Sequence, residues 1–338
     1  MSARFAALIA GLLLSFAPIG CASALGSEAE RPAYVLPDGS ISIVAGERLA
    51  PLLTRLNALF LTMHPEYRIT LTTPKSEVAT MQAFAAGVTP FAVMDRESWG
   101  VRVEDRPFLQ TRGYAPTDIR FGRVGYFAPG RPHPPAVYVN VDNPISALTL
   151  AQVAAIFTTG HEGGDVTHWG QVGLADRWRD HRIHSYGPPD NGYGASALRG
   201  SRMKGYPFNP NYEAQSDDAA IIAAVAGDIF GIAIVDHPVA VQAQSPRVRM
   251  VPLADTGGAA PSAGTHADVA AGRYPLSPFL HLYVDRKPGQ PLDPFVEAYA
   301  RMLLSDAGQA IVAAEASDGS GLVPLTPAEV AAELSGLR

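Results

Sequence analysis

A loop at residues 190–200, DNGYGASALRG, has the glycine spacing of a loop that wraps an anion at the start of a helix. Backbone N–H groups at such a helix start point at the ligand, and the helix dipole favours negative charge. The positions that would usually carry a hydroxyl or guanidinium group hold Pro189, Tyr193 and Ala195. Tyr193 therefore either stacks on a ligand or fills the space those groups left. The candidate ligand-binding residues of the loop are Asn191, Gly192, Tyr193 and Gly194.

Two cations, Arg48 and Lys75, fall at predicted helix starts. A cation there opposes the helix dipole at a cost of about 0.3 to 1 kcal/mol, and an anion between the two would relieve the conflict. Ser76 adds a hydroxyl group beside Lys75. A partner carboxylate such as Glu47 would give the same relief, and two solvated side chains that bind nothing would fit the pattern as well. Arg48, Lys75 and Ser76 are candidate ligand-binding residues with these alternatives open.

Asp95 and Arg96 stand at the end of a predicted strand, where ligands of α/β proteins bind. A buried carboxylate there can accept a hydrogen bond from a protonated ligand, and it repels an anion that carries no proton. Asp95 is the candidate for this role, with Arg96 as its partner. The alternative is a surface ion pair at a strand end, with no ligand.

Patterns typical of hydrolases and metal sites are missing from the sequence. It has no Gly-x-Ser-x-Gly or His-Glu-x-x-His motif, and its single cysteine, Cys21, stands in the N-terminal segment. His181 and His184 fall in a predicted strand, where a spacing of three places them on opposite faces, which disfavours a shared metal. His161 and His168 are the other pair of histidines whose spacing comes near that of a metal-binding site. We expect a binding protein, not an enzyme, without metal or cofactor.

The first 24 residues carry one positive charge, Arg4, then an apolar stretch and the small-x-small ending Ala-Ser-Ala. These features predict a secretory signal peptide at residues 1–24, whose apolar part is too short for a permanent membrane span. The preceding PIGC sequence is compatible with lipid attachment at Cys21, which is the alternative to cleavage after Ala24. Residues 25–37 are polar and are expected to be loosely ordered.

The formal charge is −6, and it becomes −7 without Arg4, from 25 basic and 32 acidic residues. Since no run of basic residues occurs, we expect no nucleic-acid partner. A net-acidic protein still binds a small anion where helix starts and a few cations meet its charge locally. The length of 338 residues predicts about two domains.

The elements that must position these residues alternate between strand and helix. Leu49, Leu52, Leu53 and Leu56 recur at helical spacing after the first strand, and Gly87 is a helix stop. Such alternation predicts mainly parallel sheets with helices on both faces and ligands at the carboxyl ends of the strands. The predicted strands of the first half cover residues 40–46, 67–73 and 89–95, with helices from 47 and from 75, and residues 136–144 start a second unit.

The second half begins with the most clearly marked helix start of the sequence. Thr149 and Gln152 form a capping box for a helix at 150–157, and Leu148 with Val153 supplies a hydrophobic staple. Ser216 or Asp217 caps a helix that Gly227 ends, and a long helix is expected from Pro294. The predicted strands here cover residues 181–187, 229–235 and 279–285.

Several of these stretches resemble the periplasmic phosphate-binding proteins that deliver ligand to an ABC importer. They are residues 138–160 with THWGQVG at 167–173, residues 217–235, and residues 274–312 with GLVPL. The resemblance covers residues 40–325 and implies a two-lobed α/β fold, each lobe a mainly parallel sheet flanked by helices. It implies lobe 1 at 38–130, lobe 2 at 131–245, a return to lobe 1 at 246–338, and a hinge of two crossovers at 124–136 and 236–252.

The ligand motifs depart from the pattern of that family. Arg48 stands where the first helix usually begins with Ser or Thr, and Asp95-Arg96 is a partial match to the end of the third strand. In the fourth loop, the alignment of the glycines places four other residues at the family's arginine, aspartate, serine and threonine. These four are Pro189, Asn191, Tyr193 and Ala195.

By this resemblance, the chain is expected to be a monomeric periplasmic solute-binding protein. It would capture phosphate or a related oxyanion between its lobes and present it to an ABC transporter permease. The alternative is a binding or interaction module of the envelope that keeps the scaffold and no longer binds phosphate, supported by the four changed loop positions.

Overall fold

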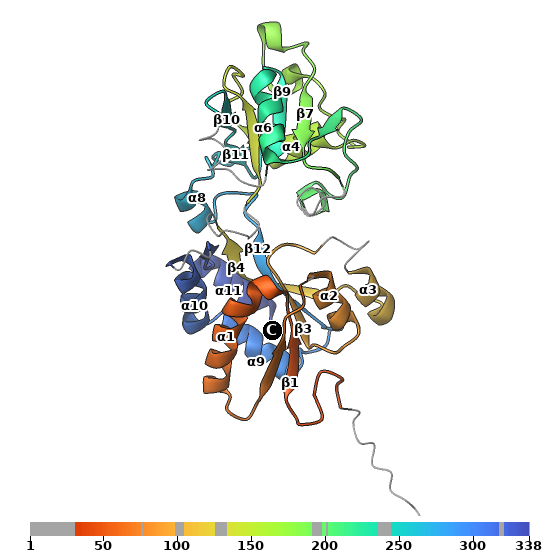
Figure 1. Ribbon diagram of the computed structural model, residues 1–338, viewed down its shortest axis with the longest axis vertical. Helices are drawn as coiled ribbons and strands as arrows, with labels where there is room; N and C mark the ends of the chain where they lie inside the picture. Colours follow the sequence, from red (N-terminus) through yellow and green to blue (C-terminus); the bar gives the residue numbers. More distant parts are fainter. Residues whose placement is uncertain are drawn as a thin grey trace, which may run out of the picture. The chain divides into compact units, whose positions relative to one another are not determined.

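The computed structural model describes residues 31–75, 77–98, 105–125, 134–190, 198–200, 202–235, 245–317 and 321–337. The described residues from Ala33 onward belong to one unit of the chain (Figure 1). The predicted signal peptide and Cys21 lie outside the described residues. Within the described part of the chain, no helix is long and apolar enough to cross a membrane.

The first predicted elements are confirmed. Strand β1 (Ile41–Val44) leads into a 3₁₀ turn, η1 (Glu47–Leu49), and helix α1 (Ala50–Met63), whose Pro51 fits the first helical turn because no N–H is needed there. β2 (Ile69–Thr72) pairs with β1 in parallel, and α2 (Glu77–Ala85) and β3 (Phe91–Met94) follow. Order begins before β1, because the Tyr34 hydroxyl donates to Asp293 and Val35 bridges to Ile41.

A four-stranded sheet continues this region in the order β13-β4-β12-β3. Its other strands are β4 (Thr117–Val124), β12 (Phe279–Val284) and β13 (Leu322–Val323). All of its pairings are antiparallel, so the expectation of a mainly parallel sheet is wrong here. The reason is that β12 arrives from the C-terminal part of the chain, inserts between β3 and β4, and runs opposite to both.

Two cores cover the two faces of this sheet. Leu280 and Leu282 of β12 pack with α1 and with α9 (Pro294–Leu303) and α10 (Asp306–Ser317), whereas Tyr283 packs with α2 and α3 (Arg106–Arg112). We call this set of elements, together with α11 (Pro327–Gly336), lobe 1. The alternation along β12 follows from the period of two in a strand.

The long helix expected from Pro294 is two helices. α9 begins after the N-cap Asp293, whose side chain accepts from the N–H of Phe295 and Val296, and it ends at Leu303. A Cβ at Gly308 would lie 2.2 Å from the carbonyl oxygen of Met302, so the chain folds back tightly where only glycine fits. The apolar pattern continues across this break, so the sequence did not reveal it.

A five-stranded sheet in the order β10-β5-β9-β7-β8 forms the centre of what we call lobe 2. β7 runs parallel to its neighbours β8 and β9, whereas β5 is antiparallel to β9 and β10, so this sheet is mixed and not mainly parallel. The strands are β5 (Ala136–Asn140), β7 (His184–Gly187), β8 (Tyr212–Ala214), β9 (Gly231–Val235) and β10 (Val248–Met250).

The predicted helix caps of lobe 2 are confirmed. Thr149 accepts from the N–H of Gln152 at 3.1 Å, and Gln152 accepts from the N–H of Thr149 at 2.9 Å, at the start of α4 (Leu150–Phe157). Asp217, one of the two predicted caps, accepts from the N–H of Ala220 at the start of α6 (Asp218–Gly227). Remaining elements of this lobe are β6 (Leu148–Thr149), η3 (Trp169–Val172), η4 (Asp176–Trp178), β11 (Leu253–Ala254) and α8 (His266–Ala270).

The return to lobe 1 comes later than residue 246, which corrects the expected boundary. β10 pairs with β5 and β11 with β6, and apolar residues as far as Leu276 belong to the core of lobe 2. The crossing falls at Ser277, whose hydroxyl donates to the carbonyl oxygen of Val124 at 2.9 Å. Residues 126–133 and 236–244, which hold most of the expected hinge, lie outside the described residues.

Candidate functional site

Two of the predicted residues, Arg48 and Asp95, meet in lobe 1. Asp95 follows β3 directly, and Arg48 lies in η1, which follows β1, so both stand at the carboxyl ends of strands. A guanidinium nitrogen of Arg48 lies 3.6 Å from a carboxylate oxygen of Asp95. The side chain of Asp95 is 1% exposed and that of Arg48 is 35% exposed, so the cation joins a buried carboxylate to the surface.

Arg96 is not the partner of a surface ion pair with Asp95. Its side chain is buried, and its Nη1 donates to the carbonyl oxygen of Glu97 at 2.9 Å. Since Asp95 is also buried, the surface-pair alternative is wrong for this segment. A buried carboxylate is costly unless charges or hydrogen bonds meet it. Arg48 is a cation within salt-bridge range of it.

The chain after β3 is held in place by two contacts at Ser98. The Ser98 N–H donates to the hydroxyl of Tyr283 on β12 at 2.9 Å, and the Ser98 hydroxyl donates to Asp105 at 2.9 Å. Burial raises the pKa of Tyr283 above its ordinary value, so this hydroxyl stays neutral. These contacts fix the backbone that carries Asp95 and Arg96.

Lys75 is exposed and stands on a segment tied to the same region. The N–H of Glu47 donates to the carbonyl oxygen of Pro74 at 3.1 Å, which places Lys75 one residue from the turn that carries Arg48. Ser76 lies outside the described residues. The site in lobe 1 is therefore built on three strand ends, with Arg48 and Asp95 at its centre.

The glycine loop of lobe 2 is described at its two ends. Asn191, Gly192, Tyr193 and Gly194 lie outside the described residues, as does Ala195. Before the loop, Tyr212 donates to the carbonyl oxygen of Pro188 at 2.6 Å, and a Cβ at Gly187 would lie 2.3 Å from the Tyr212 hydroxyl. Glycine at 187 is thus required by the close approach of this tyrosine.

Two arginines after the loop were missed by sequence reasoning. Arg199 lies 3.2 Å from the carboxylate of Asp190, and Arg202 lies 2.8 Å from the carboxylate of Glu97. The signal in the sequence was the pair of cations in LRGSR, three residues apart, directly after the glycine loop. This ion pair joins the chain that follows the glycine loop to the chain that follows Asp95.

The histidines considered for a metal have other contacts. His181 stacks on Phe230 with ring centroids 3.9 Å apart, and His184 pairs with Asp228 at 2.6 Å. His161 bonds the Thr158 hydroxyl through its Nε2. In the described residues, no group of three His, Cys, Asp or Glu side chains is placed to hold a metal ion.

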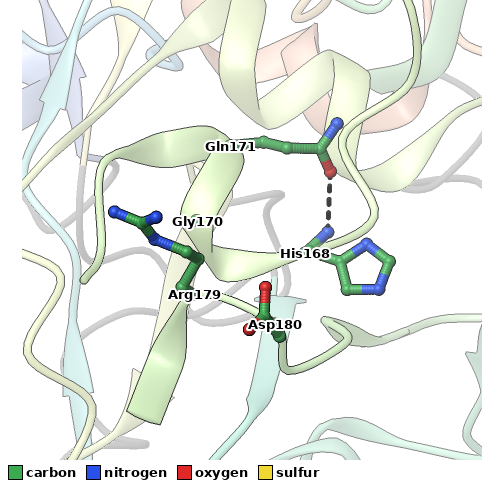
Figure 2. A pocket seen from close by; sticks show the side chains of 5 residues that line it. All are labelled: His168, Gly170, Gln171, Arg179 and Asp180. Atoms are coloured by element: carbon green, nitrogen blue, oxygen red, sulfur yellow. Dashed lines mark hydrogen bonds between the residues drawn. The ribbon is translucent and has the colours of Figure 1, made fainter. Parts of the chain in front are cut away.

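One open pocket of about 360 Å³ lies elsewhere in lobe 2 (Figure 2). None of the predicted anion-binding residues lines it. The side-chain Oε1 of Gln171 accepts from the backbone N–H of His168 at 2.8 Å, which caps η3 (Figure 2). The other lining residues are Gly170, Arg179 and Asp180, and Arg179 and Asp180 are exposed. The pocket thus lies against a surface turn of lobe 2, and the Arg48–Asp95 pair lies in lobe 1.

Two α/β lobes, with charged residues at the strand ends of each, define a two-lobed ligand-binding protein. Residues 35–307 match the family described as the PBP superfamily domain. This match covers most of the chain, and the chain therefore belongs to the PBP superfamily domain family.

Relatives agree with this membership. The chain is 29% identical over 331 residues to the phosphate-binding protein PstS of Pseudomonas aeruginosa, and the match covers 96% of each chain. Among solved structures, PstS from Borrelia burgdorferi has a TM-score of 0.52 at 13% identity, covering 84% of this chain and 98% of that one. The second likeness shows the shared two-lobed fold.

Proposed function

We propose that the protein captures phosphate or a related oxyanion between its two lobes and delivers it to an ABC importer. The buried Asp95 with Arg48 at 3.6 Å is the observation that carries this proposal. The family membership and the similarity to PstS of Pseudomonas aeruginosa along almost the whole chain support phosphate as the ligand.

The chemistry of the proposed site needs no large net charge. Helix starts and backbone N–H groups supply partial positive charge, and Arg48 and Lys75 add two cations at the ends of β1 and β2. Asp95 distinguishes ligands, because monohydrogen phosphate can donate a hydrogen bond to a carboxylate, and sulfate, which carries no proton, cannot. Ligand bound to both lobes would shift the population toward the form that a permease recognises.

The setting follows from the same proposal. The protein acts as a binding protein, without catalysis, and works as a monomer in the periplasm after removal of residues 1–24. Its partners are the oxyanion and the permease of the importer. Lipid attachment at Cys21 is the alternative way of holding it at the membrane.

A second candidate function rests on the changed glycine loop. Pro189, Asn191, Tyr193 and Ala195 replace side chains that the resembling family uses for its ligand. On this reading the scaffold is a binding or interaction module of the envelope without phosphate affinity. Importer genes beside this one favour transport, and their absence favours the module.

Isothermal titration distinguishes the two. Residues 25–338 are unfolded and refolded to remove carried-over ligand, then titrated with orthophosphate, a phosphonate and sulfate at pH 7. Binding of phosphate at micromolar concentration or below supports oxyanion capture. An absence of heat and of thermal stabilisation at millimolar phosphate supports the module.

A further inference from the structure

The ion pair between Arg202 and Glu97 connects lobe 2 to the segment that carries Asp95. The Arg202 Nη2 and Glu97 Oε1 atoms lie 2.8 Å apart, and both side chains are about three-quarters buried, at 24% and 23% exposure. A pair at this depth is screened less by salt than one on the open surface.

Both members of the pair are held by other contacts. Arg202 also reaches the carbonyl oxygen of Ser277 at 3.5 Å, at the crossing between the lobes. Glu97 stands between Arg96, which donates to its carbonyl oxygen, and Ser98, which is bonded to Tyr283. The two charges therefore face each other from fixed backbone.

Arg202 differs from the other arginine after the glycine loop. Arg199 is paired within lobe 2, with Asp190 at 3.2 Å, and its guanidinium lies over the ring of Phe208. Arg202 is paired with lobe 1, two residues from Asp95. Of these two cations, it is the one paired with the segment that carries Asp95.

The carboxylate of Glu97 has the same chemical character as the ligand. Arginine offers a planar fork of donors that suits a carboxylate and a tetrahedral oxyanion alike. An oxyanion bound near Asp95 and within reach of Arg202 would compete with Glu97 for this guanidinium.

We propose that Arg202 is the oxyanion-binding cation of lobe 2 and that Glu97 occupies it as an internal competitor until ligand arrives. This inference rests on the proposed function. When the ligand replaces Glu97, one ion pair of Arg202 breaks and another forms. The charge of Arg202 is therefore paired in the ligand-free and in the ligand-bound protein. Glu97 then sets the affinity, because the ligand must displace it.

A double-mutant cycle tests the exchange. Residues 25–338 are titrated with orthophosphate as wild type, Glu97→Gln, Arg202→Gln and the double variant, each checked for folding by circular dichroism. We expect Glu97→Gln to bind about fivefold tighter and Arg202→Gln about tenfold weaker, typical of partly buried ion pairs. In the Arg202→Gln background, Glu97→Gln should change affinity by less than about twofold, because the competitor has lost its target.

Arg202→Lys gives a second variant that keeps the charge and loses the fork, with affinity between those of wild type and Arg202→Gln. The matched control is the surface pair of Arg301 and Glu297 in lobe 1, with atoms 2.7 Å apart. Neutral variants of that pair should leave phosphate affinity unchanged.

The outcomes separate this inference from the proposed function. Phosphate binding that is equal in wild type and Glu97→Gln overturns the competitor while phosphate capture stands. If Glu97→Gln raises phosphate affinity as much in the Arg202→Gln background as in the wild type, Glu97 merely repels the ligand by its charge. This outcome also overturns the competitor. Phosphate binding that is seen with Glu97→Gln and not with the wild type supports Glu97 as the competitor. No binding by any of these variants overturns the proposed function together with the inference.

Discussion

In the proposed site, the carboxylate of Asp95 determines the selectivity between phosphate and sulfate. We expect Asp95→Asn to weaken phosphate binding about tenfold and to raise sulfate binding, since an amide no longer repels an anion without a proton and can donate to it. Titration with both ions at pH 7 gives the ratio of the two affinities. Asp255→Asn, at an exposed position in lobe 2, is the control. An unchanged ratio would place the ligand away from Asp95.

Sequence reasoning found the central residues of the site but not their pairing. Arg48 and Asp95 were each predicted from their positions at element ends, whereas Arg96 was expected to partner its neighbour. In the bend that follows β3, Asp95 lies within salt-bridge distance of Arg48, and the Arg96 side chain donates to the Glu97 carbonyl oxygen. Arg202 was missed because its partner is far away in the sequence.

Helix α11 offers a test at the level of the element. Burial alone would raise the pKa of Glu329, but hydrogen bonds from Arg123 and from the N–H and hydroxyl of Thr326 lower it from 4.5 to about 2. The carboxylate therefore stabilises the fold above pH 4.5, and this contribution is lost as the pH falls from 4.5 to 2.

We expect Glu329→Gln to lower the free energy of unfolding by about 1 to 2 kcal/mol at pH 7, after allowance for solvent screening, and by much less near pH 3. Urea unfolding of the variant and the wild type across this range measures the difference. Glu297→Gln, in a surface pair, should show a small difference at every pH. A difference for Glu329→Gln that stays constant from pH 7 to 3 contradicts the assignment.

Local signals in the sequence located the elements well, and long-range pairing escaped them. The capping box at Thr149 and the stop at Gly87, which has a φ of 74°, are short-range chemistry that the sequence states directly. Strand direction depends on which distant segment arrives beside a strand. β12 enters between β3 and β4 from the C-terminal part, and no pattern within β3 or β4 records this.

At the scale of the whole molecule, the resemblance to a known family gave the two lobes, and packing corrected their extent. Residues 246–276 were assigned to lobe 1, yet Val251, Leu253 and Val269 are buried in the core of lobe 2. Apolar residues predict that a segment is buried but not in which core. That assignment needed the pairing of β10 with β5.

Ligand binding must also appear in the stability of the whole chain. A ligand that binds the folded protein alone adds about 2.7 kcal/mol to the free energy of unfolding at 100 times its Kd. We expect phosphate to raise the denaturant midpoint of residues 25–338, and sulfate at equal ionic strength to raise it much less. Both anions are excluded from protein surfaces and strengthen apolar burial, so this general effect is common to the two. The excess for phosphate is therefore specific binding, and it should grow with the logarithm of phosphate concentration. Equal midpoints in the two salts would leave only the general effect and would contradict phosphate capture.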